Sequence, residues 1–106
     1  MARFMRVIVF FDLPVSSAAQ RRAYTDFRRF LIKDGFDMLQ YSVYARITRN
    51  YDDANKHISR IQTHLPPEGS VRILSVTEKQ YASMKIMLGK QTISEKRLSD
   101  NEIIVF

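Results

Sequence analysis

The chain has 106 residues, of which 45% are hydrophobic, and it contains no cysteine. This length and apolar content suit a single compact domain over residues 1–106 and exclude a disordered polypeptide. The lack of cysteine excludes disulfides, zinc–thiolate sites and cysteine nucleophiles. Lys and Arg number 17 against 11 Asp and Glu, which gives a net charge of +6. A positive field of this size attracts polyanions, and nucleic acid is the first candidate.

The charge alone leaves two alternatives to a nucleic-acid partner. The partner could be an anionic membrane surface, or the protein could be basic without any polyanionic partner. The membrane is disfavoured because no amphipathic segment has a purely basic polar face. The N-terminal apolar run is also too short to cross a bilayer and lacks the cleavage pattern of a secretory signal. We therefore expect no membrane partner and a cytoplasmic location.

The N-terminal third predicts a strand followed by a helix. Residues 4–11 form a continuous run rich in Val, Ile and Phe, which is typical of a central strand buried on both faces. Ser17 and Gln20 have the spacing of a capping box, and Gly35 suits the position just after a helix end. Between them, apolar residues recur at helical spacing. These signals predict a helix over about residues 18–34.

The middle of the chain predicts a second strand region and a second helix. Residues 36–48 alternate between apolar and polar, which predicts a strand. It could be broken near its start into two short pieces, although no strong turn signal marks a break. A helix follows, with a cap among residues 50–53 and an end at Pro66 and Pro67. Its apolar stripe comprises Ala54, Ile58, Ile61 and Leu65.

The last third predicts a strand and smaller elements. Residues 70–77 (SVRILSVT) predict a strand, residues 77–80 a short helical turn and residues 85–88 (KIML) a brief strand. Residues 102–106 (EIIVF) are apolar and β-prone. The order predicts an α+β, ferredoxin-like βαββαβ fold, with two helices on one face of an antiparallel sheet and an extra C-terminal strand. The uncovered sheet face favours a homodimer, and the segment over about residues 85–106 suits pairing with another chain.

Asp12 is a carboxylate placed directly after the most apolar run, at the rim of the predicted sheet. It could cap backbone donors in the turn that follows. It could instead bind a metal ion, provided that two copies meet at a two-fold axis and supply two carboxylates. Mg²⁺ is typically bound by one or two carboxylates together with waters and a substrate phosphate. The residues alone leave both alternatives open.

The first predicted helix carries a basic stripe. Arg22, Arg29 and Lys33 fall on its outer face, with Arg21 and Arg28 beside them. Arg22 and Arg29 are seven residues apart, about 10.5 Å along the helix axis, which is a plausible spacing for contacts to successive phosphates. A solvated helix face is the alternative.

Other candidate chemistry is sparse. His57 and His64 lie too far apart to share a metal ion at i, i+4 spacing, and we expect both on the surface. Tyr41 and Tyr44 point to opposite faces of their strand, and core or interface positions are favoured over base stacking. No P-loop, Rossmann glycine pattern or HExxH motif is present.

Three segments of the chain resemble the CRISPR-associated protein 2 family, and most closely its type II branch. They are MRVIVFFDLPV, RRAYTDFRRFLIKDGFDMLQYSVYARI and SVRILSVTEKQYASM. The resemblance implies a ferredoxin-like homodimer that joins the CRISPR-associated protein 1 integrase to capture foreign double-stranded DNA and insert it as new spacers. It also implies Mg²⁺-dependent endonuclease activity on RNA or DNA, with one Mg²⁺ ion shared by Asp12 of both chains. Basic residues of the family map loosely onto Arg21 and Arg22, while Ser42 and Tyr44 fall in a matched motif with a structural role or a place near the dimer cleft.

These expectations give a DNA-binding adaptation scaffold with a metal-dependent phosphodiesterase site. Asp12 is the expected catalytic and metal-binding residue, and Arg21, Arg22, Arg28 and Arg29 are the expected nucleic-acid contacts. A stand-alone, toxin-like mRNA interferase of the same fold is the alternative. A non-enzymatic RNA-binding module ranks last, because the strand around Tyr44 lacks the glycine-bearing motif typical of that class.

Overall fold

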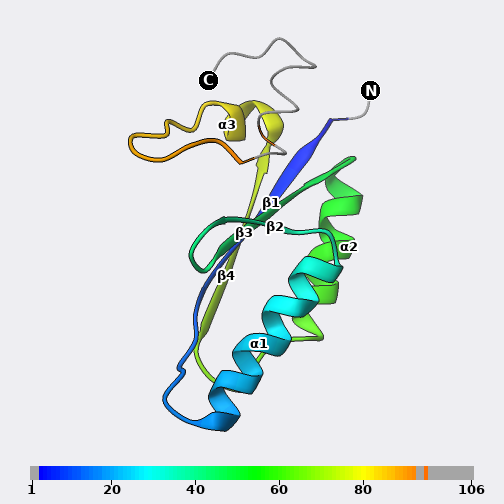
Figure 1. Ribbon diagram of the computed structural model, residues 1–106. Coiled ribbons are helices and arrows are strands. Elements are labelled where there is room, and N and C mark those ends of the chain that lie inside the picture. The colour runs from blue at the N-terminus through cyan, green and yellow to red at the C-terminus, as the bar shows by residue number, and fades with distance from the viewer. Residues whose placement is uncertain (1–2, 93–94, 96–106) are drawn as a thin grey trace.

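The computed structural model describes residues 3–92 and 95. Within them, four strands form one antiparallel sheet in the order β2-β3-β1-β4. The elements, in chain order, are β1 (Met5–Asp12), α1 (Ala18–Lys33), β2 (Asp37–Gln40), β3 (Val43–Thr48), α2 (Tyr51–Gln62), β4 (Ser70–Thr77) and α3 (Glu78–Ala82). The expected α+β, ferredoxin-like βαββαβ fold is confirmed, and α1 and α2 lie on the same side of the sheet (Figure 1).

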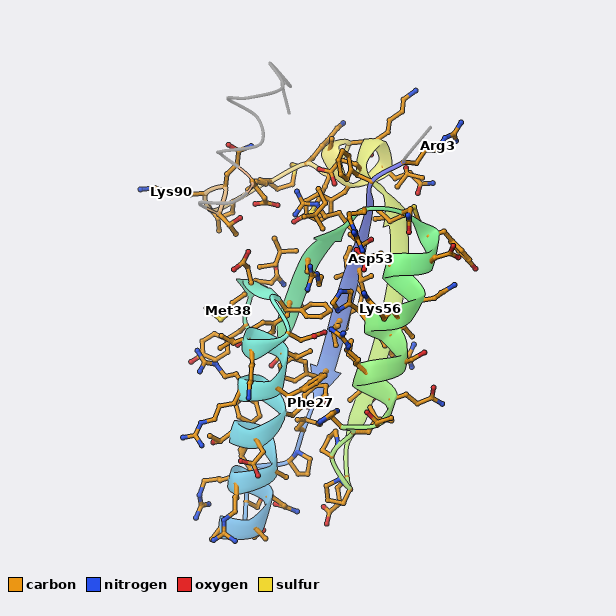
Figure 2. The ribbon with its side chains drawn as sticks, turned by 90° about the vertical axis from the view of Figure 1, so that its right-hand side faces the viewer. Arg3, Phe27, Met38, Asp53, Lys56 and Lys90 are labelled. Atoms are coloured by element: carbon orange, nitrogen blue, oxygen red, sulfur yellow. The ribbon has the colours of Figure 1, made fainter. Side chains whose placement is uncertain are left out.

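β1 is the central strand, and its alternate side chains divide between the two faces of the sheet. Val7, Val9 and Phe11 are buried against the helices. Phe27 of α1 lies between that helix and β1 (Figure 2), and its ring meets that of Phe11 edge-on with centroids 5.4 Å apart. The remaining buried members of this core are Leu13, Leu31, Phe36, Tyr44, Ala54 and Ile61. Because one face of β1 carries the core, its other face is left for different contacts.

The second face of the sheet is only partly covered. Tyr81 of α3 packs there against Ile8 and Ala45. Arg6 fastens this end of the face, because its Nε donates to Glu78 Oε2 over 2.7 Å and its guanidinium lies 4.5 Å from the centre of the Tyr81 ring. Burial and the hydrogen bond from its hydroxyl to Glu95 raise the pKa of Tyr81 well above its usual range. This face is therefore closed beside Arg6 and open toward the end of β1.

The helix ends follow the sequence closely. Ser17 and Gln20 form the expected capping box, and α1 ends one residue earlier than expected, before Gly35 at a φ of 90°. Asn50 caps α2. The expectation that Leu65 belongs to the stripe of α2 is wrong, because the helix ends at Gln62 and Leu65 is half exposed. A residue that precedes a proline is disfavoured in helical conformation, so the helix ends before the prolines.

One strand expectation is confirmed in its broken form, and another is wrong. Residues 36–48 form a hairpin, β2 and β3, which is the break that the sequence left open, with Tyr41 and Ser42 at its turn. Ser42 adopts a φ of 62° without being a glycine, which is why no turn signal marks the break. Residues 85–88 form no strand, and Met87 and Leu88 are almost fully exposed. The expected strand over residues 102–106 lies outside the described residues.

The structure offers no membrane span. Within residues 3–92 and at 95, none of the helices combines the length and the apolar character that crossing a bilayer would require. The longest helix, α1, has 16 residues and exposes several arginines.

His57 is buried, contrary to the expectation of a surface residue, whereas His64 is exposed as expected. His57 Nδ1 donates to Asp34 Oδ2 over 2.7 Å, and its Nε2 lies 3.5 Å from Asp53 Oδ1. Arg60 Nη1 also donates to Asp34, over 2.9 Å. This network ties the end of α1 to α2, because Asp34 is the residue that caps α1.

The same network shifts the titration of both carboxylates. Burial on its own would raise the pKa of Asp34, but the hydrogen bonds from His57 and Arg60 hold it below the ordinary value of 3.8. The backbone amide of Arg49 donates to Asp53 and lowers the pKa of that carboxyl too. Groups whose folded pKa is lowered stabilise the fold above their unfolded pKa, and this stabilisation is lost as the pH falls through the folded pKa.

We therefore expect the free energy of unfolding to fall steeply below about pH 4. Asp34→Asn should lower the stability at neutral pH by about 1–3 kcal/mol and flatten the pH dependence below pH 4. Urea unfolding from neutral pH down to about pH 3 measures both effects. Asp26→Asn is the control, since Asp26 is an exposed acid of α1 with no recorded partner among the described residues. An equal change in both variants would contradict the role of the network.

Candidate metal and nucleic-acid site

Asp12 is the last residue of β1, where it lies opposite Ser70 of β4. Its side chain is exposed and falls on the open face, the one that also carries Phe10. Within the described part of the chain, no hydrogen bond or ion pair holds its carboxylate. The backbone donors at the start of α1 are instead capped by Ser17 and Gln20. The turn-cap interpretation of Asp12 is therefore wrong, and the carboxylate is free to bind a ligand.

A shallow hollow of about 270 Å³ surrounds Asp12 on the open face. It is lined by Phe10, Phe11, Asp12, Tyr41, Ser42, Val43, Ser70 and Arg72. The hairpin turn is held against the end of β1, because the amide of Phe11 donates to the carbonyl of Ser42 over 3.0 Å. The hollow therefore brings four oxygen-bearing side chains together, those of Asp12, Tyr41, Ser42 and Ser70.

These side chains carry oxygen atoms, the ligand type that Mg²⁺ prefers, but the described residues of one chain place only one carboxylate in the hollow. Mg²⁺ prefers oxygen ligands, commonly one or two carboxylates with several waters. The hollow offers a single carboxylate, and the described residues contain no group of three His, Asp or Glu side chains able to hold a metal. The described residues supply no second carboxylate to the hollow, and a second copy of the chain would supply one. Asp12 of each copy is the residue that would bind the ion.

The four arginines expected to contact nucleic acid are all exposed on α1 but differ in their contacts. Arg21 Nη1 donates to the carbonyls of Val15 and Ser16 and so supports the turn after β1. Arg28 Nε donates over 2.8 Å to the hydroxyl of Tyr44, which is a buried core residue.

Arg22 and Arg29 have no recorded partner in the described part of the chain. In Figure 2, nitrogen-tipped side chains project from α1 away from the sheet. The unpaired arginines of this outer face are better placed for phosphates than the two that support the fold.

Comparison with known proteins decides the family. The model of the CRISPR associated protein Cas2 family matches residues 5–84. This chain belongs to that family.

Its relatives carry the name CRISPR-associated endoribonuclease Cas2. The one from Acidovorax ebreus is 57% identical over 102 residues, which cover 96% of this chain and 100% of the relative. The one from Treponema denticola is 46% identical over 101 residues, 95% of this chain and 99% of the relative. The one from Campylobacter jejuni is 39% identical over 104 residues, 98% of this chain and 73% of the relative.

Two residues beside Asp12 in this Cas2-family chain were missed by the sequence interpretation. Arg72 lines the hollow, and Gly69 lies close to the backbone of Asp12 and Leu13 at the end of β1. A Cβ at Gly69 would stand 2.7 Å from the carbonyl oxygen of Asp12 and 2.7 Å from Leu13 Cδ2, at a φ of 105°. Only the register between β1 and β4 reveals these neighbours, and a single sequence does not state that register.

We expect Gly69→Ala to be destabilising and to disturb Asp12. The added methyl group must push the end of β1 away, and the positive φ adds strain, for a loss of about 2 kcal/mol or more. Gly89→Ala is a matched control, because Gly89 has a φ of 109° but a Cβ there meets nothing within 4 Å. Urea unfolding should therefore show a smaller loss for Gly89→Ala, of about 1 kcal/mol. Equal losses in the two variants would show that the contact with Asp12 is unimportant.

Proposed function

We propose that this protein is a metal-dependent phosphodiesterase and nucleic-acid-binding scaffold of CRISPR adaptation, active as a homodimer. One observation carries the proposal: the exposed, unpaired carboxylate of Asp12 at the end of the central strand, in a hollow on the open sheet face. A carboxylate with no partner in its own chain suits a metal ion held between two chains. The names of the relatives support a nuclease function and favour RNA as the cleaved nucleic acid.

The homodimer is supported by the same face. Phe10 and Leu74 lie there with 39% and 50% of their surfaces exposed. A second copy that covers them would also bring a second Asp12 toward the first. One Mg²⁺ ion shared by the two carboxylates would then polarise a phosphate oxygen and lower the pKa of a bound water.

The chain's own residues would hold and orient the reacting groups. The two Asp12 side chains would hold the ion at the sheet rim, because β1 is paired with β4 up to Asp12, while its pairing with β3 ends at Phe10. The hydroxyls of Ser42 and Ser70 can donate hydrogen bonds to phosphate oxygens in the hollow. Single-stranded nucleic acid fits this hollow better than a duplex does, because the exposed ring of Tyr41 at the hollow can stack on an unpaired base.

The scaffold role rests on charge and not on Asp12. The net charge of +6 doubles in a dimer, and the unpaired arginines of α1 lie on its outer face. Such a surface suits double-stranded DNA carried to the CRISPR-associated protein 1 integrase. A pull-down with that integrase, followed by a spacer-insertion assay, tests the scaffold role separately from hydrolysis.

We expect Asp12→Ala to lose metal-dependent cleavage of single-stranded RNA by on the order of 100-fold or more, because the ion loses its carboxylate ligand. Cleavage should be measured with Mg²⁺ and again with a chelator. Sedimentation velocity should show an unchanged dimer, and Asp26→Ala should cleave as the unmodified protein does. Undiminished cleavage by Asp12→Ala would remove this residue from the mechanism, and a monomer at all working concentrations would remove the shared site.

We expect the double variant Arg22→Ala, Arg29→Ala to bind duplex DNA more weakly and with a flatter salt dependence. Each lost phosphate contact lowers the slope of log affinity against log salt by about one. The matched control is Arg3→Ala, Lys90→Ala, which removes the same charge from exposed positions beyond the far end of the sheet (Figure 2). An equal fall in slope for both double variants would mean that α1 has no special part in DNA binding.

A further inference from the structure

The hollow around Asp12 contains one cationic side chain, that of Arg72. Arg72 lies opposite Phe10 in the pairing of β4 with β1, while Ser70 lies opposite Asp12. Arg72 is therefore the diagonal neighbour of Asp12 on the open face. Diagonal neighbours across an antiparallel pair are about 7–8 Å apart, a distance that a long side chain spans.

The guanidinium of Arg72 is exposed and has no recorded hydrogen bond, ion pair or ring contact among the described residues. Other arginines of the sheet and its flanks are engaged. Arg6 pairs with Glu78, Arg60 with Asp34, and Arg46 donates to backbone carbonyls. Arg72 is within reach of a free carboxylate and is still not paired with it. One hollow thus holds a cation and an anion that do not pair with each other.

That arrangement is complementary to a phosphodiester with a divalent cation beside it. The divalent cation would lie beside the Asp12 carboxylate. The anionic phosphate oxygens would face a guanidinium, which can donate two parallel hydrogen bonds to them. We propose that Arg72 binds the scissile phosphate of the nucleic acid and stabilises the charge on its oxygens during cleavage. This inference rests on the proposed function, since it assigns the phosphate-binding residue of the same site.

The reaction itself leaves Arg72 unchanged. A bond forms between phosphorus and the oxygen of the attacking water, and the bond between phosphorus and the departing sugar oxygen breaks. The departing sugar oxygen takes up the proton that the water loses. Arg72 forms and breaks no covalent bond, and its role is electrostatic.

Two other roles for Arg72 lead to different results. A solvated surface cation would contribute to general affinity no more than any exposed arginine. An arginine that pairs with an acid of the second copy would hold the dimer together, and its removal would yield monomers. Dimer content, RNA affinity and turnover therefore separate the three roles.

The first measurement is RNA affinity without cleavage. Fluorescence anisotropy with a labelled single-stranded RNA should show that Arg72→Gln weakens binding about tenfold in the cleavage-deficient Asp12→Asn dimer. Arg3→Gln in the same background is the matched control, because Arg3 is also exposed, has no recorded partner among the described residues and lies before the start of β1, at the opposite end of the strand from Asp12. An equal loss in both, or no loss for Arg72→Gln, overturns the proposal.

The second measurement is turnover of the otherwise unmodified dimer. Arg72→Gln should lower kcat about 100-fold, with the half-saturating Mg²⁺ concentration unchanged, and Arg72→Lys should recover part of the loss. Dissociation of the Arg72→Gln dimer in sedimentation velocity overturns the proposal in favour of an interface ion pair. If the unmodified protein shows no Mg²⁺-dependent cleavage, the proposed nuclease function fails, while the affinity comparison still decides whether Arg72 binds phosphate.

Discussion

The pairing of β1 on both of its edges is the constraint on which the rest of the structure depends. Six residues of β1 pair with β3 and eight with β4, so its register is fixed along its whole length. That register sends Val7, Val9 and Phe11 into the helix-side core. It leaves the alternate residues, with Asp12 last, on the open face. A shift by one residue would bury the carboxylate and expose the core, so the hydrophobic alternation itself positions the candidate site.

The two surfaces proposed to contact nucleic acid lie on opposite sides of the sheet. α1 covers the face of the sheet that carries the main core, and it presents Arg22 and Arg29 outward. The hollow with Asp12 and Arg72 lies on the opposite, open face. A strand that touches both must pass around the rim at the turn between β1 and α1. If the proposed function holds, duplex binding and cleavage should therefore be lost independently. Arg21 braces that rim through the carbonyls of Val15 and Ser16 and affects both only indirectly.

The sequence predicted the features that have local signals. The apolar run of β1, the capping box of α1 and the strand over residues 70–77 needed no long-range information. The turn at Ser42 was not located because a serine with positive φ carries no glycine or asparagine signal. His57 was misplaced because its partner Asp34 is 23 residues away, and Arg72 was missed because only the β1–β4 register places it beside Asp12. The errors concern contacts between distant segments, which periodicity does not encode.

The extent of the proposed dimer interface follows from the energy that the open face can contribute. Burying the exposed parts of Phe10 and Leu74 in both copies would contribute about 3–5 kcal/mol. Association costs about 4–15 kcal/mol in lost freedom, so these two side chains do not hold a stable dimer. Residues 84–88 add four exposed apolar side chains, Met84, Ile86, Met87 and Leu88, worth about 8–16 kcal/mol if both copies bury them. The proposed dimer therefore needs apolar area beyond Phe10 and Leu74, and residues 84–88 are a segment that can supply it.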